Sequence, residues 1–173
     1  MIIAPPKENE TFGYYDNYIS EVKHKDLLKG LKEFQGSTNN YILSLPEETL
    51  NYRYAEGKWS IKEIIGHLID CEIVFSYRAL RFARKDKTPL PSFDENMYAK
   101  TNDAGNRDIM FLMREFDAIR NSTIHLFNSF DPNVLDEKGT ANNLTMTPRS
   151  LGYAILGHEM HHLDVIKERY VKG

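Results

Sequence analysis

The chain has 173 residues, of which 41% are hydrophobic and 27% are charged, a balance typical of a globular protein. This length predicts a single domain over residues 1–173. The net charge is only −3 and no basic stripe stands out, so nucleic acid is not expected as a partner. The one cysteine, Cys71, excludes an internal disulfide and fits a reducing compartment. No signal peptide or membrane-spanning apolar run is evident, so we expect a cytoplasmic protein with no membrane partner.

The first 18 residues are predicted to form an irregular arm, because Pro5, Pro6 and Gly13 interrupt any regular pattern. Aromatic side chains are expected to pin this arm to the body of the protein: Phe12, Tyr14, Tyr15 and Tyr18. A first helix is predicted over about 20–45 from apolar residues at three- and four-residue spacing, and Pro46 ends it.

A second helix has the clearest start signal in the chain. Ser60 and Glu63 have the spacing of a capping box, and Trp59 and Ile64 that of a hydrophobic staple. The helix is predicted from residue 61 to about 84. His67 lies beside its apolar stripe, and two residues share its side: Asp70 and Cys71.

The end of this helix and the segment after it are polar. Glu72 is expected to pair with a residue such as Arg78 or Arg81. The basic residues here form either a solvated helix end or an anion-binding rim: Arg78, Arg81, Arg84, Lys85 and Lys87. In the long connection over 85–106, three residues are either substrate contacts or local caps of the bundle end: Phe93, Asp94 and Tyr98.

A third helix is predicted over about 107–130. A fourth is predicted to start at the Thr147 cap and Pro148 and to continue to about Arg169. No convincing strand pattern or internal repeat is present. Four helices of about 20 residues predict an all-α four-helix bundle.

Histidines on two of the predicted helices form a candidate metal site. His158 and His162 are four residues apart and share one helical face, which is the apolar one, and His67 faces the core from the second helix. Neutral imidazoles suit zinc, nickel, iron or copper, and three protein ligands leave a position open for chemistry. The alternative is a cluster of core histidines satisfied by hydrogen bonds.

His158-Glu159-Met160-His161-His162 also matches the H-E-x-x-H pattern of zinc metalloproteases, in which Glu159 would be the general base. Only residues 163–173 follow, none is histidine, and the strands of a protease cleft are not predicted. We therefore treat a metalloprotease as a minor alternative. Glu159 is expected on the helix surface or behind the ligands, and it is one of three candidate bases: Glu159, His161 and Asp70.

Three segments resemble the DinB/YfiT-like family of metalloenzymes: residues 52–63, residues 66–72 and residues 157–162. The resemblance implies a four-helix bundle with up-down-down-up topology and long crossovers. It also implies a divalent metal, nickel or zinc, and carries the ligand role onto His67, His158 and His162.

Some members of that family transfer low-molecular-weight thiols such as bacillithiol or mycothiol, others are thiol-dependent isomerases, and many have no known activity. The resemblance therefore implies a metal-dependent thiol S-transferase or hydrolase acting on a small molecule, with a thiol as co-substrate in the first case. It also implies a homodimer. The alternative from another class is a non-catalytic metal-binding or stress-response bundle.

Overall fold

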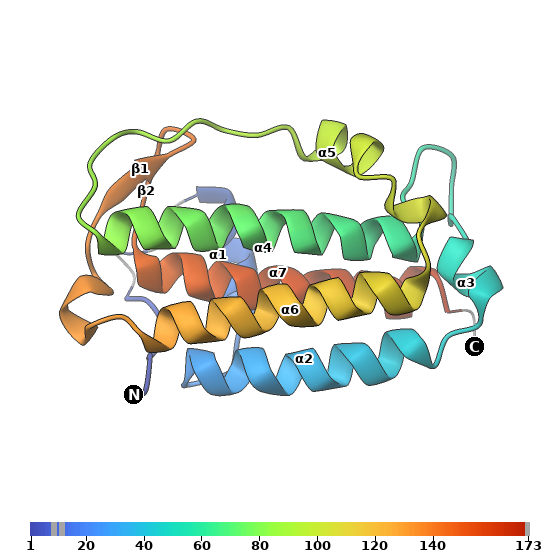
Figure 1. Ribbon diagram of the computed structural model, residues 1–173, viewed down its shortest axis with the longest axis horizontal. Helices are drawn as coiled ribbons and strands as arrows, with labels where there is room; N and C mark the ends of the chain where they lie inside the picture. Colours follow the sequence, from blue (N-terminus) through green and yellow to red (C-terminus); the bar gives the residue numbers. More distant parts are fainter. Residues whose placement is uncertain (8–9, 11–12, 172–173) are drawn as a thin grey trace.

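Four long helices lie side by side in the computed structural model, which describes residues 1–7, 10 and 13–171 (Figure 1). They are α2 (Leu27–Leu43), α4 (Ile61–Ala83), α6 (Ile109–Asn128) and α7 (Pro148–Arg169). Helices α2 and α7 run in one direction, and α4 and α6 run in the other. This is the up-down-down-up arrangement, and it confirms the predicted all-α four-helix bundle. Within the described residues, no helix is long and apolar enough to cross a bilayer.

Local capping chemistry sets where the long helices begin. The predicted capping box of α4 is present: the Ser60 amide donates to Glu63 Oε2 at 2.6 Å, and the Glu63 amide donates to Ser60 Oγ at 3.3 Å. Thr147 caps α7, as predicted. The predicted start of the first helix near residue 20 is wrong, because the Asp26 side chain accepts from the Leu28 amide and caps α2 there.

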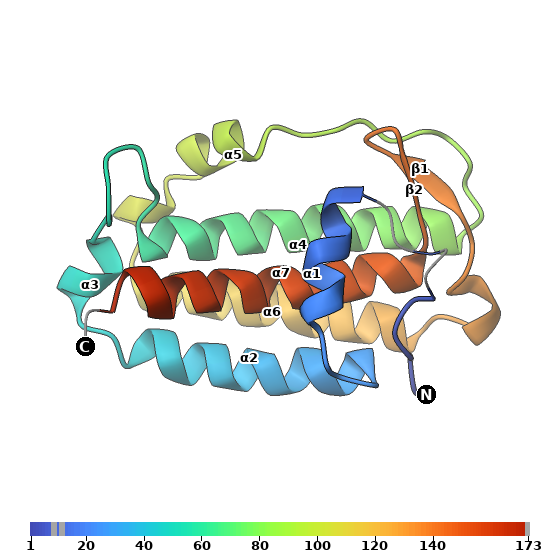
Figure 2. The ribbon, with the colours of Figure 1, turned by 180° about the vertical axis from the view of Figure 1, so that it is seen from behind.

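The N-terminal arm is more ordered than predicted. A 3-10 helix, η2 (Gly13–Tyr15), leads into α1 (Asp16–Glu21), which crosses α7 (Figure 2). Gly157 permits this close approach, since a Cβ there would lie 2.1 Å from the Tyr18 carbonyl oxygen. The backbone of α1 therefore packs directly on α7. One of the four aromatic residues predicted to pin the arm, Phe12, lies outside the described residues.

Two connections carry short elements. The link from α2 to α4 holds α3 (Glu47–Asn51). Because α4 and α6 run in the same direction, the chain between them must travel the length of the bundle, and it carries α5 (Glu95–Thr101) and η3 (Ala104–Asn106) on the way (Figure 1).

The link from α6 to α7 contains strands that the sequence pattern did not predict. After η4 (Pro132–Val134), strands β1 (Gly139–Ala141) and β2 (Leu144–Met146) pair antiparallel. Their turn residues, Asn142 and Asn143, both have positive φ (52° and 59°), as a tight hairpin turn requires. The Leu90 amide donates to the Thr140 carbonyl at 2.9 Å, which ties the long crossover to this hairpin.

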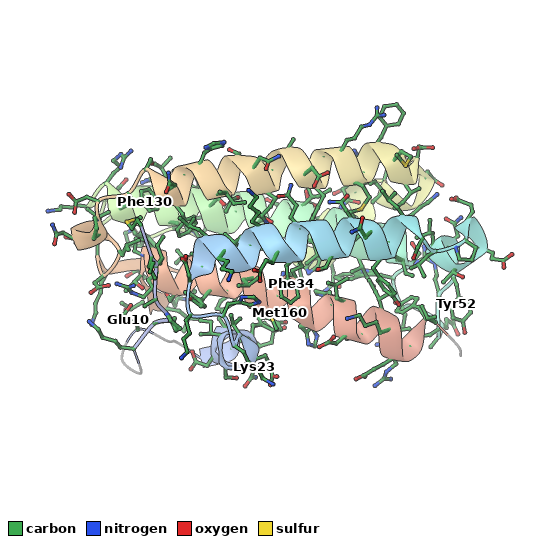
Figure 3. The ribbon with its side chains drawn as sticks, turned by 90° about the horizontal axis from the view of Figure 1, so that it is seen from below. Glu10, Lys23, Phe34, Tyr52, Phe130 and Met160 are labelled. Atoms are coloured by element: carbon green, nitrogen blue, oxygen red, sulfur yellow. The ribbon has the colours of Figure 1, made fainter. Side chains whose placement is uncertain are left out.

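The apolar core falls into two clusters along the bundle axis. One includes Phe75, Phe127 and Leu156, and the other includes Ile65 and Phe116. Seen from below, Phe34 of α2 and Met160 of α7 lie near each other; Phe34 is partly buried against both clusters and Met160 against the first (Figure 3). The two clusters leave a layer between them that is occupied by polar side chains.

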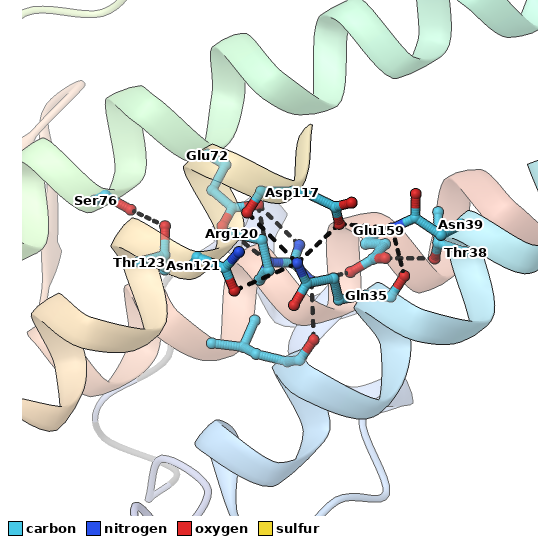
Figure 4. Close-up of polar contacts among 11 residues, drawn as sticks. Gln35, Thr38, Asn39, Glu72, Ser76, Asp117, Arg120, Asn121, Thr123 and Glu159 are labelled. Atoms are coloured by element: carbon cyan, nitrogen blue, oxygen red, sulfur yellow. Dashed lines mark hydrogen bonds and ion pairs between the residues drawn. The ribbon is translucent and has the colours of Figure 1, made fainter. Parts of the chain in front are cut away.

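This polar layer is centred on Arg120 of α6, which is 1% exposed (Figure 4). Its Nη2 donates to Glu72 Oε2 of α4 at 2.8 Å, and its Nη1 donates to Glu159 Oε2 of α7 at 2.7 Å and to the Leu31 carbonyl of α2 at 3.2 Å. Thr38 of α2 donates to the second oxygen of Glu159. One arginine therefore joins all four long helices.

The expected pairing of Glu72 with Arg78 or Arg81 is wrong. Arg120 lies 48 residues away in the chain and reaches Glu72 only through the packing of α6 on α4. Burial works against every charge in this layer. The two neighbouring carboxylates nevertheless raise the pKa of Arg120 above its usual value, so the arginine stays charged.

Replacing Arg120 with methionine should destabilise the fold by about 3–5 kcal/mol, because it leaves two buried carboxylates without their cation. The matched control is Arg107→Met, which breaks a surface ion pair with Glu115 and should cost less than about 1 kcal/mol. Urea denaturation followed by circular dichroism measures both. A loss for Arg120→Met no larger than that for Arg107→Met would show that the buried layer does not hold the bundle together.

Candidate metal centre

The structure brings the three predicted histidines together. His67 comes from the first half of α4, and His158 and His162 come from adjacent turns of α7. The Nε2 atom of His158 lies 3.1 Å from Nε2 of His67 and 3.0 Å from Nε2 of His162. The ring centres of His67 and His162 are 5.0 Å apart. All three rings therefore face one small volume.

These separations suit ligands of one ion. Imidazole nitrogens at about 2.0–2.1 Å from a tetrahedral ion are about 3.3 Å from each other. Hydrogen bonds among the imidazoles would satisfy these nitrogens less well than a metal ion, because a single proton at His158 Nε2 can be donated to only one of its two neighbours. The residues present therefore fit a divalent metal with three nitrogen ligands.

Burial makes the three imidazoles neutral at pH 7. His67 is 3% exposed and burial lowers its pKa to about 4. Burial lowers the pKa of His162 to about 3, with a further contribution from the neighbouring histidines. The pKa of His158 falls well below its usual value for the same two reasons. Neutral imidazoles have free lone pairs, which metal binding requires.

Two aromatic side chains pack against the imidazole rings of His67 and His158. The Trp59 ring lies 4.7 Å from the ring of His67, and the Tyr18 ring of α1 lies 5.2 Å from that of His158. The sequence pattern assigned Trp59 only to a staple and Tyr18 only to an anchoring role. Burial raises the pKa of Tyr18, as does its hydrogen bond with Tyr14, so its hydroxyl remains protonated and can donate.

Cys71 lies beside the histidines as well. Its Sγ is 3.6 Å from Nδ1 of His67, and Cys71, His67 and His158 can place one ligand atom each within 4.8 Å of one another. The residue is 2% exposed. Burial raises the pKa of its thiol, so the group is neutral at pH 7 and is a poorer metal ligand than the three nitrogens.

The three candidate bases have different surroundings, and only His161 contacts one of the three histidines, with its ring 5.2 Å from that of His162. Glu159 is 1% exposed, and its carboxylate is bound by Arg120 and Thr38, so the expectation of a helix-surface position is wrong. This orientation also removes the geometry on which the metalloprotease alternative rests. Asp70 accepts a hydrogen bond from Asn102 at 2.8 Å. His161 is exposed and packs against Tyr18.

Two pockets open on either side of the histidines. One of about 430 Å³ lies between α1, α4 and the long crossover, and it reaches His158 and Cys71. The other, of about 310 Å³, reaches His161 and His162 beside Trp59. Small molecules could therefore approach the cluster from two directions.

The long crossover and the arm supply walls of the larger pocket. Phe93 and Asp94 line it, and Asp94 caps α5 by accepting from two backbone amides, which confirms the predicted local cap; a contact of either residue with substrate stays a prediction. Tyr98 packs against Phe93 at 5.3 Å. Tyr14 and Tyr15 line the same pocket. Their role was not predicted, although a cluster of aromatics in a polar arm is a signal that could have indicated it.

Comparison with known proteins gives relatives that cover most of the chain. Two proteins of Oceanobacillus iheyensis, each named a "putative metal-dependent hydrolase", are similar to it. One is 27% identical over 152 residues, or 85% of this chain and 87% of that protein. The other is 22% identical over 153 residues, or 86% of this chain and 87% of that protein.

The fold is shared with a solved structure, that of YfiT from Bacillus subtilis, which is described as a "probable metal-dependent hydrolase with an unusual four-helix bundle topology". The TM-score is 0.72, with 15% sequence identity over 94% of this chain and 89% of that one. The model of the DinB superfamily matches residues 31–166, a span that includes α4, α6 and all three histidines. The chain therefore belongs to the DinB superfamily.

Proposed function

We propose that this protein is a metal-dependent hydrolase of small molecules, and that His67, His158 and His162 hold its divalent ion. The convergence of three neutral Nε2 atoms beside a pocket of about 430 Å³ carries the proposal. The names of the two Oceanobacillus relatives support hydrolysis as the reaction. Zinc and nickel both suit imidazole ligands, and we propose one of these two.

A bound divalent ion would supply Lewis-acid chemistry and lower the pKa of a water molecule. The chain supplies the remaining functions. Trp59 and Tyr18 keep the imidazoles of His67 and His158 in place by packing on their rings. Tyr14 and Tyr18 both line the larger pocket, and because their hydroxyls share one hydrogen bond, one of the two protons is free to be donated to a substrate oxygen that gains negative charge. Phe93 helps to enclose the pocket.

Transfer of a low-molecular-weight thiol to an electrophile is the second candidate. The observation that favours it is the second pocket, of about 310 Å³, because a two-substrate reaction needs room for two molecules at the centre. Cys71 is not suited to be the nucleophile itself, since burial keeps its thiol protonated. Turnover of 4-nitrophenyl esters without added thiol would favour hydrolysis, whereas turnover only with thiol would favour transfer. A homodimer remains a prediction for either activity.

Replacing His67 or His162 with alanine should abolish stoichiometric binding of zinc or nickel, because two imidazoles hold an ion far less tightly than three. The matched control is His125→Ala, an exposed histidine on α6 that should leave metal content unchanged. Elemental analysis of protein purified without an affinity tag measures the content. Quenching by nickel of Trp59, the only tryptophan in the chain, gives a second readout beside His67.

Equal metal content in wild type and His67→Ala would overturn the ligand assignment. Stoichiometric metal in wild type, without turnover of esters or of thiol and electrophile pairs, would favour the non-catalytic alternative.

Acid should destabilise the chelator-treated protein below pH 6.5. The folded pKa of His67, about 4, lies below the usual value of 6.5, so the unfolded chain binds the proton first as pH falls. The contribution of this histidine to stability is therefore complete above pH 6.5 and is lost towards pH 4. It amounts to about 3 kcal/mol at most, at about 1.4 kcal/mol per pKa unit. Urea unfolding at several pH values measures the slope, which His67→Ala should make shallower; an unchanged slope would contradict the assigned pKa.

A further inference from the structure

Arg78 of α4 differs from the other basic residues at the end of its helix. It is 2% exposed, so the predicted solvated helix end does not include it. Its Nη2 donates to the Pro91 carbonyl at 2.9 Å, and its guanidinium lies 5.6 Å from the centre of the Phe93 ring. These contacts fix the side chain against the long crossover. Among the described residues, no group accepts a hydrogen bond from Nη1, which is buried.

No carboxylate among the described residues forms an ion pair with Arg78, in contrast with Arg81, Arg120 and Arg149, each of which has at least one. A buried cation without a counter-charge is costly, and a buried N–H without an acceptor adds to that cost. Such a group is retained where a ligand supplies the missing charge. Of the basic residues that the sequence offered as an anion-binding rim, only Arg78 lines the pocket beside His158, so this residue is the candidate for the anion site.

Arg78 lines the same pocket of about 430 Å³ that reaches His158. It lies eleven residues after His67 on α4, which is three helical turns, so both residues are on one face and about 16 Å apart along the helix axis. Helical side chains lean towards the N-terminus, which directs Arg78 back towards His67. The lining of the pocket therefore includes both His158 of the histidine cluster and the unpaired Arg78.

The charges around the pocket favour a monoanion. Asp94 and Glu95 of the crossover lie at its exposed rim and would repel a doubly charged group. Tyr15 lies beside the guanidinium as well: burial raises the pKa of this tyrosine, and both the charge of Arg78 and a hydrogen-bonding interaction with it oppose the rise, so the hydroxyl is a neutral neighbour and not a counter-charge. A guanidinium that offers one free nitrogen beside a phenol is suited to a carboxylate.

We propose that Arg78 binds a carboxylate of the substrate, so that the substrates are small esters or amides with an acid group several bonds from the hydrolysed bond. This inference rests on the proposed hydrolase function, since it names the substrate class of the same site. Arg78 selects the substrate and does not touch the bond that breaks. Its loss should therefore change binding of acidic substrates and leave neutral ones unaffected.

The test compares two esters of equal acyl length, 4-nitrophenyl hexanoate and mono-4-nitrophenyl adipate, which differ by a terminal carboxylate. The metal-loaded wild type should have the lower KM for the adipate ester. Arg78→Met should raise that KM about 10- to 100-fold, the range for a lost hydrogen bond to a charged group. Its kcat, and the KM for the hexanoate ester, should stay unchanged. Arg81→Gln, which alters a paired arginine one turn on, is the matched control and should change neither KM.

Equal changes with both esters, or none with the adipate ester, would overturn the inference. Arg78→Lys keeps the charge without the planar fork and should show a smaller rise in KM, which keeps the test valid if the methionine variant folds poorly. Arg78 has no ion pair to lose, so Arg78→Met should keep a melting temperature within a few degrees of wild type. A large drop shared by both variants would indicate a structural role instead.

If neither ester is hydrolysed, the proposed function fails and the inference is judged by binding alone. Monomethyl adipate should then raise the melting temperature of chelator-treated wild type but not of Arg78→Met, and dimethyl adipate should stabilise neither. No stabilisation of wild type by monomethyl adipate would overturn the carboxylate site. A larger effect of inorganic phosphate, also dependent on Arg78, would overturn the assignment to carboxylates.

Discussion

The buried contact of Arg120 with Glu72 and Glu159 is the constraint on which the rest of the structure depends. Apolar packing alone allows a bundle helix to rotate about its axis at modest cost, because several hydrophobic side chains can exchange places in the core. A charged side chain held by two carboxylates allows only one arrangement. Glu72 directly follows Cys71 on α4, and Glu159 directly follows His158 on α7. The network therefore orients both helices that carry the candidate ligands, and it turns the acidic residue of the H-E-x-x-H pattern away from them.

The histidine cluster has the opposite character. Polar groups in the Arg120 layer find their partners within the protein. In the histidine cluster, Nε2 of His158 lies within hydrogen-bonding distance of Nε2 of both His67 and His162, but it can form a hydrogen bond with only one of them at a time. Arg78 repeats this pattern in the lining of the same pocket. Buried groups whose binding capacity the chain itself does not satisfy cost stability, and they concentrate where a protein binds something else. These unsatisfied groups support the two proposals for this region, a divalent metal on the histidines and a small acidic molecule on Arg78.

Much of this could be predicted from the sequence, and the exceptions have physical reasons. The long helices follow from a 3.6-residue period over about 20 residues and from local caps such as Ser60 with Glu63. The three histidines follow from spacing on apolar faces. The short elements could not be predicted in this way, because α1 is stabilised by its packing on Gly157 and each strand of the hairpin has only three residues, too few to show an alternating pattern. The partner of Glu72 was missed because a residue far away in the chain supplies it only once the helices have packed.

X-ray absorption spectroscopy of the zinc- or nickel-loaded protein tests the central claim most directly, because it reads the donor atoms around the ion itself. Three imidazole nitrogens with oxygen as the remaining donor is the predicted result, with zinc–nitrogen distances of about 2.0–2.1 Å if the ion is zinc. Such a shell agrees with ligation by His67, His158 and His162 and with a position left open to solvent. A sulfur donor at about 2.3 Å would contradict the account, since it would place Cys71 in the shell. A shell with fewer than three imidazoles would contradict it as well.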